Sequence, residues 1–224
     1  MTENTDIRAE VVRAAQAMDE SGLVVGTAGN VSGRHTGGTI WLTPSSLPYD
    51  QVSIDNLAGV DLEGNLVAGV SRPSTEKAMH LACYRAFPEV GGVLHCHPVH
   101  ASMFAVAHRS IPAVIEEVII YLGGDVAVAD YRPTGTDELG EEVVRHLADR
   151  SAVLMANHGM LCVGSSPNHA LHAAQVAEHT ARIVWGASRL SDPVELPTKA
   201  RSDFAEVYSY LRTQTWATSA RLLS

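Results

Sequence analysis

Short apolar runs that end at glycine or proline recur along the chain between segments with helical periodicity. The tripeptide Glu63-Gly64-Asn65 predicts a hairpin turn, and the glycine-rich stretch 26–38 suits loops or bulged strands. Hairpin signals recur, and strands do not alternate strictly with helices. We therefore expect a three-layer α/β/α sandwich with a mainly antiparallel central sheet. Strand-like segments are residues 39–44, 60–69, 91–97, 126–131 and 151–164.

Helices are expected where apolar residues repeat every three to four positions. Ile7, Val11 and Met18 share one stripe, and Ser74 precedes a helical segment that Pro88 ends. The expected helices cover residues 6–19, 74–87, 100–109, 136–147 and about 168–190. A length of 224 residues suits one large domain, so we expect a single domain over residues 1–224 with a C-terminal helical tail from about residue 193.

The charge balance excludes several classes of protein. The chain has 25 acidic and 16 basic side chains, a formal charge of −9, and Lys77 and Lys199 are its two lysines, which argues against a nucleic-acid surface. It contains no 18-residue apolar run and no basic, then apolar, leader segment, so neither a membrane span nor export is expected. Three widely spaced cysteines predict no disulfide framework. We expect a cytoplasmic protein without membrane or nucleic-acid partners.

Histidines supply the strongest chemical signal. His95 and His97 are two residues apart in a strand-like segment, so both side chains leave the same face while Cys96 points to the other. His158 stands at the junction of two apolar strands, where Gly159 permits a sharp turn. Three neutral imidazoles with one carboxylate or water form an open tetrahedral site, for which zinc is the expected ion. A packing role for each histidine is the alternative.

Glu76 is the carboxylate that we add to this set. It lies in the first turn of the helix that Ser74 is expected to cap, where an acid also complements the helix dipole. His80 is one turn further on, but it is equally suited to the core, and we leave it out of the predicted ligands.

Small polar residues form a candidate anion site. They lie in the glycine-rich loop, after a Thr-Pro pair and at a helix N-terminus, where backbone N–H groups are accessible. Each is also a common turn or cap residue, so only the set as a whole indicates binding. The candidates are Gly29, Asn30, Ser45, Ser46, Ser74 and Thr75.

Taken in order, these motifs resemble the zinc-dependent class II aldolase and adducin family. The resemblance extends to about Pro193, and the segments that carry it are GTAGNVS at 26–32, LTPSS at 42–46, PSTE at 73–76, HCHPVH at 95–100 and NHG at 157–159. It implies that His95, His97, His158 and Glu76 bind Zn²⁺, with Mn²⁺ or Co²⁺ as substitutes, and that the six small residues bind a substrate phosphate. It also implies a homotetramer with fourfold symmetry and active sites between subunits.

The implied activity is reversible cleavage of a phosphorylated ketose to dihydroxyacetone phosphate and an aldehyde. Candidate substrates are fuculose 1-phosphate, 5-deoxyribulose 1-phosphate and methylthioribulose 1-phosphate. Zinc would stabilise the enediolate, and Glu76, displaced from the metal, would move the proton. A Schiff-base route is poorly supported, because Lys77 points about 100° around the helix from Glu76 and Lys199 lies in a polar loop.

Departures from the family pattern keep other reactions open. Glu116 stands where the fuculose-phosphate aldolases carry a tyrosine, and Glu117 follows it. Either can serve as a second catalytic carboxylate, which would suit a dehydratase, decarboxylase or 4-epimerase, or both can form an exposed acidic pair. Tyr208 and Tyr210 are candidates for a catalytic C-terminal tyrosine, and we select Tyr210. An alternative of another class is a non-catalytic, adducin-like interaction module.

Overall fold

An eight-stranded sheet forms the centre of the computed structural model, which describes residues 6–216. Its strand order is β4-β3-β2-β1-β5-β8-β7-β6, and all neighbouring strands are antiparallel except the pair β6 and β7. The expected mainly antiparallel sheet is confirmed. The strands are β1 (Asn30–Arg34), β2 (Ile40–Leu42), β3 (Ala58–Val60), β4 (Leu66–Ala68), β5 (Gly92–Cys96), β6 (Val128–Ala129), β7 (Ala152–Met155) and β8 (Gly159–Gly164).

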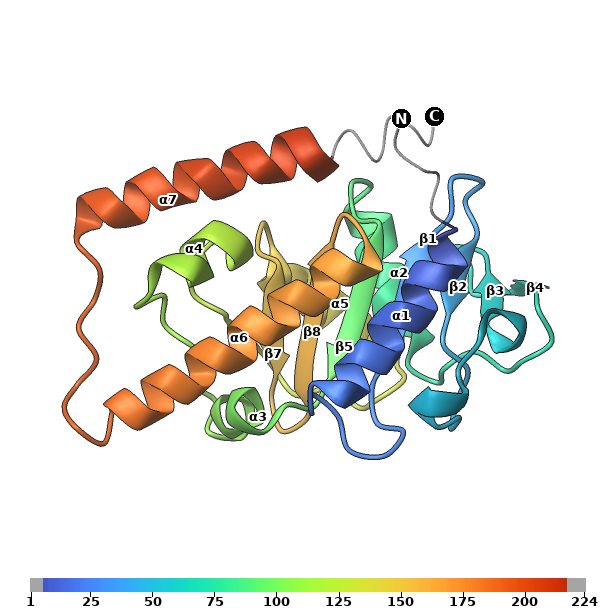
Figure 1. Cartoon of the computed structure of the whole chain (residues 1–224), viewed down its shortest axis with the longest axis horizontal. Coiled ribbons are helices and arrows are strands. Elements are labelled where there is room, and N and C mark those ends of the chain that lie inside the picture. Colours follow the sequence, from blue (N-terminus) through green and yellow to red (C-terminus); the bar gives the residue numbers. More distant parts are fainter. Residues whose placement is uncertain (1–5, 217–224) are drawn as a thin grey trace.

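Helices cover both faces of this sheet, which confirms the three-layer sandwich. On one face lie α1 (Ile7–Glu20), α3 (Val99–Val106) and α6 (Pro167–Ala187), and on the other lie α2 (Lys77–Ala86) and α5 (Asp137–Leu147). Figure 1 shows α1 and α6 crossing in front of the sheet. Each face has its own buried apolar cluster, because successive strand residues point to opposite sides.

Local sequence signals explain most of these elements. Asp6 and Thr136 accept hydrogen bonds from backbone N–H groups in the first turns of α1 and α5. The predicted hairpin joins β3 and β4, where the Asp61 carboxylate accepts hydrogen bonds from the backbone and side chain of Asn65. The turn at Gly64 has the positive φ that glycine adopts readily.

Several details differ from expectation. The strand expected over 126–131 is only two residues long, and α4 (Glu116–Leu122) forms where no helix is predicted. Glu76 is the residue before α2 and lies outside its first turn, so it carries no helical backbone constraint. The short segment 111–122 is too brief for periodicity to identify, and tertiary packing of Val118, Ile119 and Leu122 decides its structure.

The last helix, α7 (Thr198–Leu211), contacts α4 at one end of the molecule (Figure 1). It contributes Tyr208, which is buried and donates a hydrogen bond to the carbonyl of Asp149 (2.8 Å). Within residues 6–216, no helix is long and apolar enough to cross a membrane.

Candidate active site

Three histidines from two neighbouring strands meet at one end of the sheet. His95 is in β5, His97 follows its last residue, and His158 lies in the turn between β7 and β8. The ring centroids are separated by 4.6, 4.8 and 5.0 Å, and one nitrogen of each ring lies within 4.8 Å of the others. Cys96 packs in the opposite apolar cluster, with α1 and α6. The alternation of β5 thus presents both histidines on the α2 side of the sheet.

Backbone geometry at two points allows this approach. Asn157 has a φ of 55°, which turns the chain sharply between the strands, and its amide oxygen lies 2.7 Å from Nε2 of His108. At Gly159 a Cβ atom would lie 2.6 Å from the carbonyl oxygen of Cys96 and 3.1 Å from the His97 ring. Glycine is therefore required for β8 to pass so closely beside β5.

The ring nitrogens are arranged as a metal ion requires. Nδ1 of His95 donates to the carbonyl of Met160 (2.9 Å), so its Nε2 carries the lone pair that faces Nε2 of His97 at 2.8 Å. Nδ1 of His158 is buried and has no hydrogen-bond partner among the described residues. Burial lowers the pKa values of His95 and His97, and neighbouring imidazoles add to this effect. Convergent imidazole nitrogens of this kind fit a divalent cation.

Glu76 completes this cluster from α2. Its carboxylate oxygens lie 3.4 Å from Nε2 of His95 and 3.2 Å from Nε2 of His158, and the side-chain amide of Asn30 donates to Oε2 at 2.8 Å. Burial opposes ionisation of Glu76. The hydrogen bond from His158, the charges of His95 and His158, and the Asn30 amide outweigh it, and the pKa of Glu76 lies well below its ordinary value.

A hollow of about 300 Å³ opens beside these four residues. All six small residues predicted to bind an anion line it, together with Glu76, His97 and His158. Gly29 takes a φ of 96° here, and a Cβ atom would lie 2.6 Å from the carbonyl oxygen of His95. Among the described residues that line the hollow, none is lysine or arginine, so an anion there depends on neutral donors and the nearby imidazoles.

Sequence reasoning missed four further lining residues, Thr27, Ala28, Pro44 and Thr134. The first three belong to the recognised segments 26–32 and 42–46, which offered a signal for them. Thr134 comes from the loop between β6 and α5, and no pattern in the sequence connects that loop to the histidines. Packing of α5 beside α2 brings it to the hollow.

Three predicted catalytic residues lie outside this hollow. Glu116 and Glu117 occupy the N-terminal turn of α4, and neither lines the pocket with the histidines. Tyr210 is 65% exposed on α7. The hydroxyl of Tyr208 is already paired with Asp149 and Ser151. Within one chain, the structure brings together the four predicted metal ligands and the anion-binding candidates, but not these residues.

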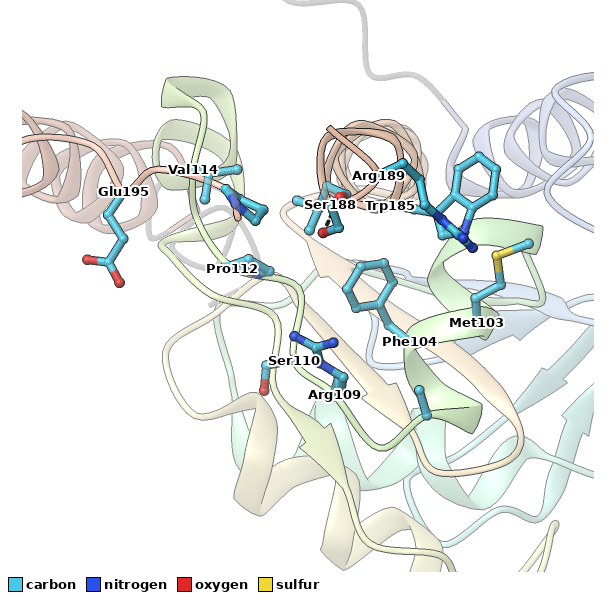
Figure 2. A pocket seen from close by; sticks show the side chains of 13 residues that line it. Met103, Phe104, Arg109, Ser110, Pro112, Val114, Trp185, Ser188, Arg189 and Glu195 are labelled. Atoms are coloured by element: carbon cyan, nitrogen blue, oxygen red, sulfur yellow. Dashed lines mark hydrogen bonds between the residues drawn. The ribbon is translucent and has the colours of Figure 1, made fainter. Parts of the chain in front are cut away.

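A larger hollow of about 620 Å³ lies elsewhere, between α3, the end of α6 and the segments that follow them (Figure 2). Figure 2 shows Phe104, Trp185, Arg109 and Arg189 around it. Arg189 stacks over the Trp185 ring at 5.5 Å from its centroid. Its described lining residues include no histidine, and Glu195 is the one acid among them, so size alone does not locate the chemical centre.

The fold and site define a three-layer α/β/α protein with a three-histidine, one-glutamate cluster beside an anion-sized pocket. The family model for the class II aldolase and adducin N-terminal domain matches residues 9–185. The chain belongs to this family, as its motifs predict.

Similar proteins carry out related reactions. A 5-methylthioribulose-1-phosphate/5-deoxyribulose-1-phosphate aldolase from Escherichia coli O45:K1 is 35% identical over 72% of this chain and 75% of its own. An L-ribulose-5-phosphate 4-epimerase from Salmonella paratyphi B is 32% identical over 80% of this chain and 84% of its own. The solved structure of an L-fuculose 1-phosphate aldolase has a TM-score of 0.86 and 29% identity, covering 92% of this chain and 97% of that one. The expected enzyme class, an aldolase-type lyase, agrees with the two aldolases among these proteins and with the family.

Proposed function

We propose that the protein is a metal-dependent class II aldolase that reversibly cleaves a phosphorylated ketose to dihydroxyacetone phosphate and an aldehyde. The observation that carries the proposal is the position of Glu76, which contacts two imidazoles and lines the same hollow as the anion-binding candidates. In such an arrangement a proton carrier and a cation site would lie beside the site that binds the substrate phosphate. Fuculose 1-phosphate, 5-deoxyribulose 1-phosphate and methylthioribulose 1-phosphate are the candidate substrates.

The side chains divide the work of such a reaction. His95, His97, His158 and Glu76 would hold the ion, for which three imidazoles and a carboxylate favour Zn²⁺ and accept Mn²⁺ or Co²⁺. When bound, the ion supplies positive charge that offsets the negative charge developing on the substrate oxygens as the carbon–carbon bond breaks. The small residues around Gly29, Ser45 and Ser74 bind the phosphate through neutral donors.

Glu76 is the proton carrier in this scheme. Cleavage removes a proton from the hydroxyl on the aldehyde side and adds one to the carbon of the dihydroxyacetone phosphate half. Glu76 is ionised, held by Asn30 and only 12% exposed, so it can take up and deliver a proton next to the hollow while largely excluded from bulk water.

The same proposal includes a homotetramer with fourfold symmetry and active sites between subunits. Glu116 and Glu117 do not line their own chain's hollow, so they could reach a substrate only in the hollow of a neighbouring copy. Exposed apolar side chains also border the larger hollow, among them Met103 and Trp185. Contiguous apolar surface of this kind is typical of interfaces.

A second candidate uses the same metal cluster for dehydration, decarboxylation or 4-epimerisation, with Glu116 or Glu117 as the second acid. The acidic pair at the start of α4 is the observation that favours it. A non-catalytic, adducin-like module is disfavoured, because such a module has no need of convergent imidazoles around a buried carboxylate.

Product analysis by NMR tests the proposal. Zinc-loaded protein is offered the three candidate substrates and ribulose phosphates, and we expect release of dihydroxyacetone phosphate with an aldehyde. Glu76→Gln keeps the shape and removes the proton carrier, so turnover should fall about 100-fold or more while the fold persists. Asp61→Asn, in the distant β3–β4 turn, is the matched control and should retain activity. Loss of water or carbon dioxide, or inversion at one carbon, would establish the second candidate instead.

A further inference from the structure

A row of buried polar side chains runs from Glu76 into the layer between β1 and α2. Its members are Asn30 and Ser32 of β1 and His80 and Tyr84 of α2, and we refer to them as the buried polar row. All four are at most 2% exposed. Contacts link them in sequence: Asn30 Oδ1 to His80 Nε2 at 2.5 Å, His80 Nδ1 to Ser32 Oγ at 2.7 Å, and Ser32 Oγ to the Tyr84 hydroxyl at 2.9 Å.

The orientation of the Asn30 amide sets the direction of every hydrogen bond in the row. Its NH₂ group donates to Oε2 of Glu76 at 2.8 Å. The amide oxygen of Asn30 then faces His80 and can only accept, so Nε2 of His80 must carry the hydrogen. A neutral His80 consequently accepts at Nδ1 from the Ser32 hydroxyl, which in turn accepts from Tyr84.

The environment of His80 favours this neutral form. Its side chain is completely buried, and the hydrogen-bond partners of its ring among the described residues are the neutral side chains of Asn30 and Ser32. Burial lowers the pKa of His80 to about 4, although the charge of Glu76 opposes this. With one hydrogen on Nε2, both ring nitrogens have a partner, and no polar atom of the ring is left unsatisfied.

We infer that His80, as the neutral Nε2–H tautomer, is a positioning residue that fixes the Asn30 amide and thereby holds Glu76 at the metal and proton-transfer site. The inference rests on the proposed function for its catalytic consequence. Without His80, the Asn30 amide loses the donor that holds its oxygen, so its NH₂ group is held less firmly toward Glu76. Glu76 precedes α2, and this amide is the neutral side chain that donates to its carboxylate.

Tautomer-resolved ¹H–¹⁵N NMR of the substrate-free protein tests the first half of the inference. The His80 resonances should show a protonated Nε2 and an unprotonated Nδ1 at pH 7. Protonation at Nδ1, alone or with Nε2, would overturn the inference. This measurement involves neither metal nor substrate, so its result is independent of whether the protein is an aldolase.

Zinc affinity, measured by chelator competition, tests the second half. His80→Leu should weaken Zn²⁺ binding about 10- to 100-fold, as loss of an outer-shell partner commonly does, and lower kcat more than it changes KM. His80→Gln restores an N–H donor near the position of Nε2 and should recover much of both. Met79→Ala, in the same turn of α2, also creates a buried defect but leaves the row intact, so it should retain wild-type zinc affinity.

Two results would contradict the positioning role. One is wild-type zinc affinity in a folded His80→Leu protein, and the other is an equal loss in Met79→Ala, which would reduce His80 to a packing residue. If His80→Leu does not fold, Ser32→Ala serves in its place. It removes the donor to Nδ1 and should weaken zinc binding by a smaller factor, whereas an unchanged affinity would overturn the inference. If the zinc affinities are as expected but the protein cleaves no ketose phosphate, the proposed function is refuted and the positioning role of His80 stands.

Discussion

Glu76 is surrounded by groups that stabilise its charge, and this environment distinguishes it from an ordinary helix-capping acid. It contacts His95 and His158, and the Asn30 amide donates to it. A capping glutamate would instead face backbone N–H groups and solvent. In the proposed scheme the residues around it act as a unit: the imidazoles would bind the cation, and the buried polar row would orient the amide.

The neutral state of His80 predicts a dependence of stability on pH. Its pKa is lowered from 6.5 to about 4 in the folded protein. Above pH 6.5, His80 is neutral in both states and has no effect. As the pH falls toward 4, the unfolded chain binds a proton that the folded protein does not, so stability is lost, by about 3 kcal/mol in total.

Urea denaturation between pH 7.5 and 4.5, on metal-free protein, measures this loss. Wild-type protein should lose more stability than His80→Gln, with the difference growing below about pH 6.5. Parallel pH profiles for the two proteins would show that His80 has the same pKa folded and unfolded. The comparison removes the contributions of the other histidines, which both proteins share.

At the scale of elements, the site depends on two strands that come unusually close. β5 carries His95 and leads into His97, and β8 begins immediately after His158. Pro98 ends the run of β5, and α3 begins directly after it, with the Glu178 carboxylate accepting from the backbone N–H groups of His100 and Ala101. The first turn of α3 is thereby anchored to α6, which holds the end of β5 in place.

Gly159→Ala should disturb this approach. The new methyl group would lie 2.6 Å from the Cys96 carbonyl and 3.1 Å from the His97 ring, so a strand or the ring must move. We expect a loss of about 1–3 kcal/mol in stability, as in other overpacked sites, together with weaker zinc binding. Urea denaturation and chelator competition measure the two effects.

Gly186→Ala is the matched control for this substitution. Gly186 lies in α6 with no atom within 4 Å of the added Cβ, so alanine should be neutral or stabilise the helix by up to about 1 kcal/mol. Equal zinc affinities in the two variants would show that the Gly159 contact has no influence on the histidines.

At the scale of the whole molecule, one chain holds only part of the proposed catalytic set. Glu76, His97 and His158 share a hollow, whereas Glu116, Glu117 and Tyr210 lie on α4 and α7 outside it. Figure 1 shows α4 and α7 grouped at one end of the molecule. The proposed tetramer would bring these helices of one subunit to the hollow of the next.

Mixed oligomers test this arrangement. Glu76→Gln and the double variant Glu116→Gln/Glu117→Gln should each be inactive alone. After subunit exchange, roughly a quarter of the sites would combine an intact Glu76 from one subunit with intact glutamates from its neighbour, so activity should return to about that level. Native mass spectrometry checks that hybrids form. Inactive hybrids would place both functions within one subunit, and a fully active double variant would remove Glu116 and Glu117 from catalysis.

Much of the fold follows from local patterns in the sequence. The hairpin at Glu63–Asn65, the capped helix after Thr136 and the mainly antiparallel sandwich were all predictable, because turn residues, caps and periodicity act over a few positions. α4 was not, since seven residues with three buried apolar side chains are too short to distinguish from a strand or loop.

The candidate site was likewise predictable from the sequence only in part. The His95-x-His97 spacing, the turn at His158 and the small residues of the loops are visible in the sequence, which therefore determined the residue types and the family. Only the tertiary structure decided that Asn30, 46 positions before Glu76, donates to the Glu76 carboxylate. It likewise decided that His80 contacts the amide oxygen of Asn30 and that Thr134 lines the hollow. Such contacts arise from packing β1 and α5 against α2, and local sequence carries no record of distances across that interface.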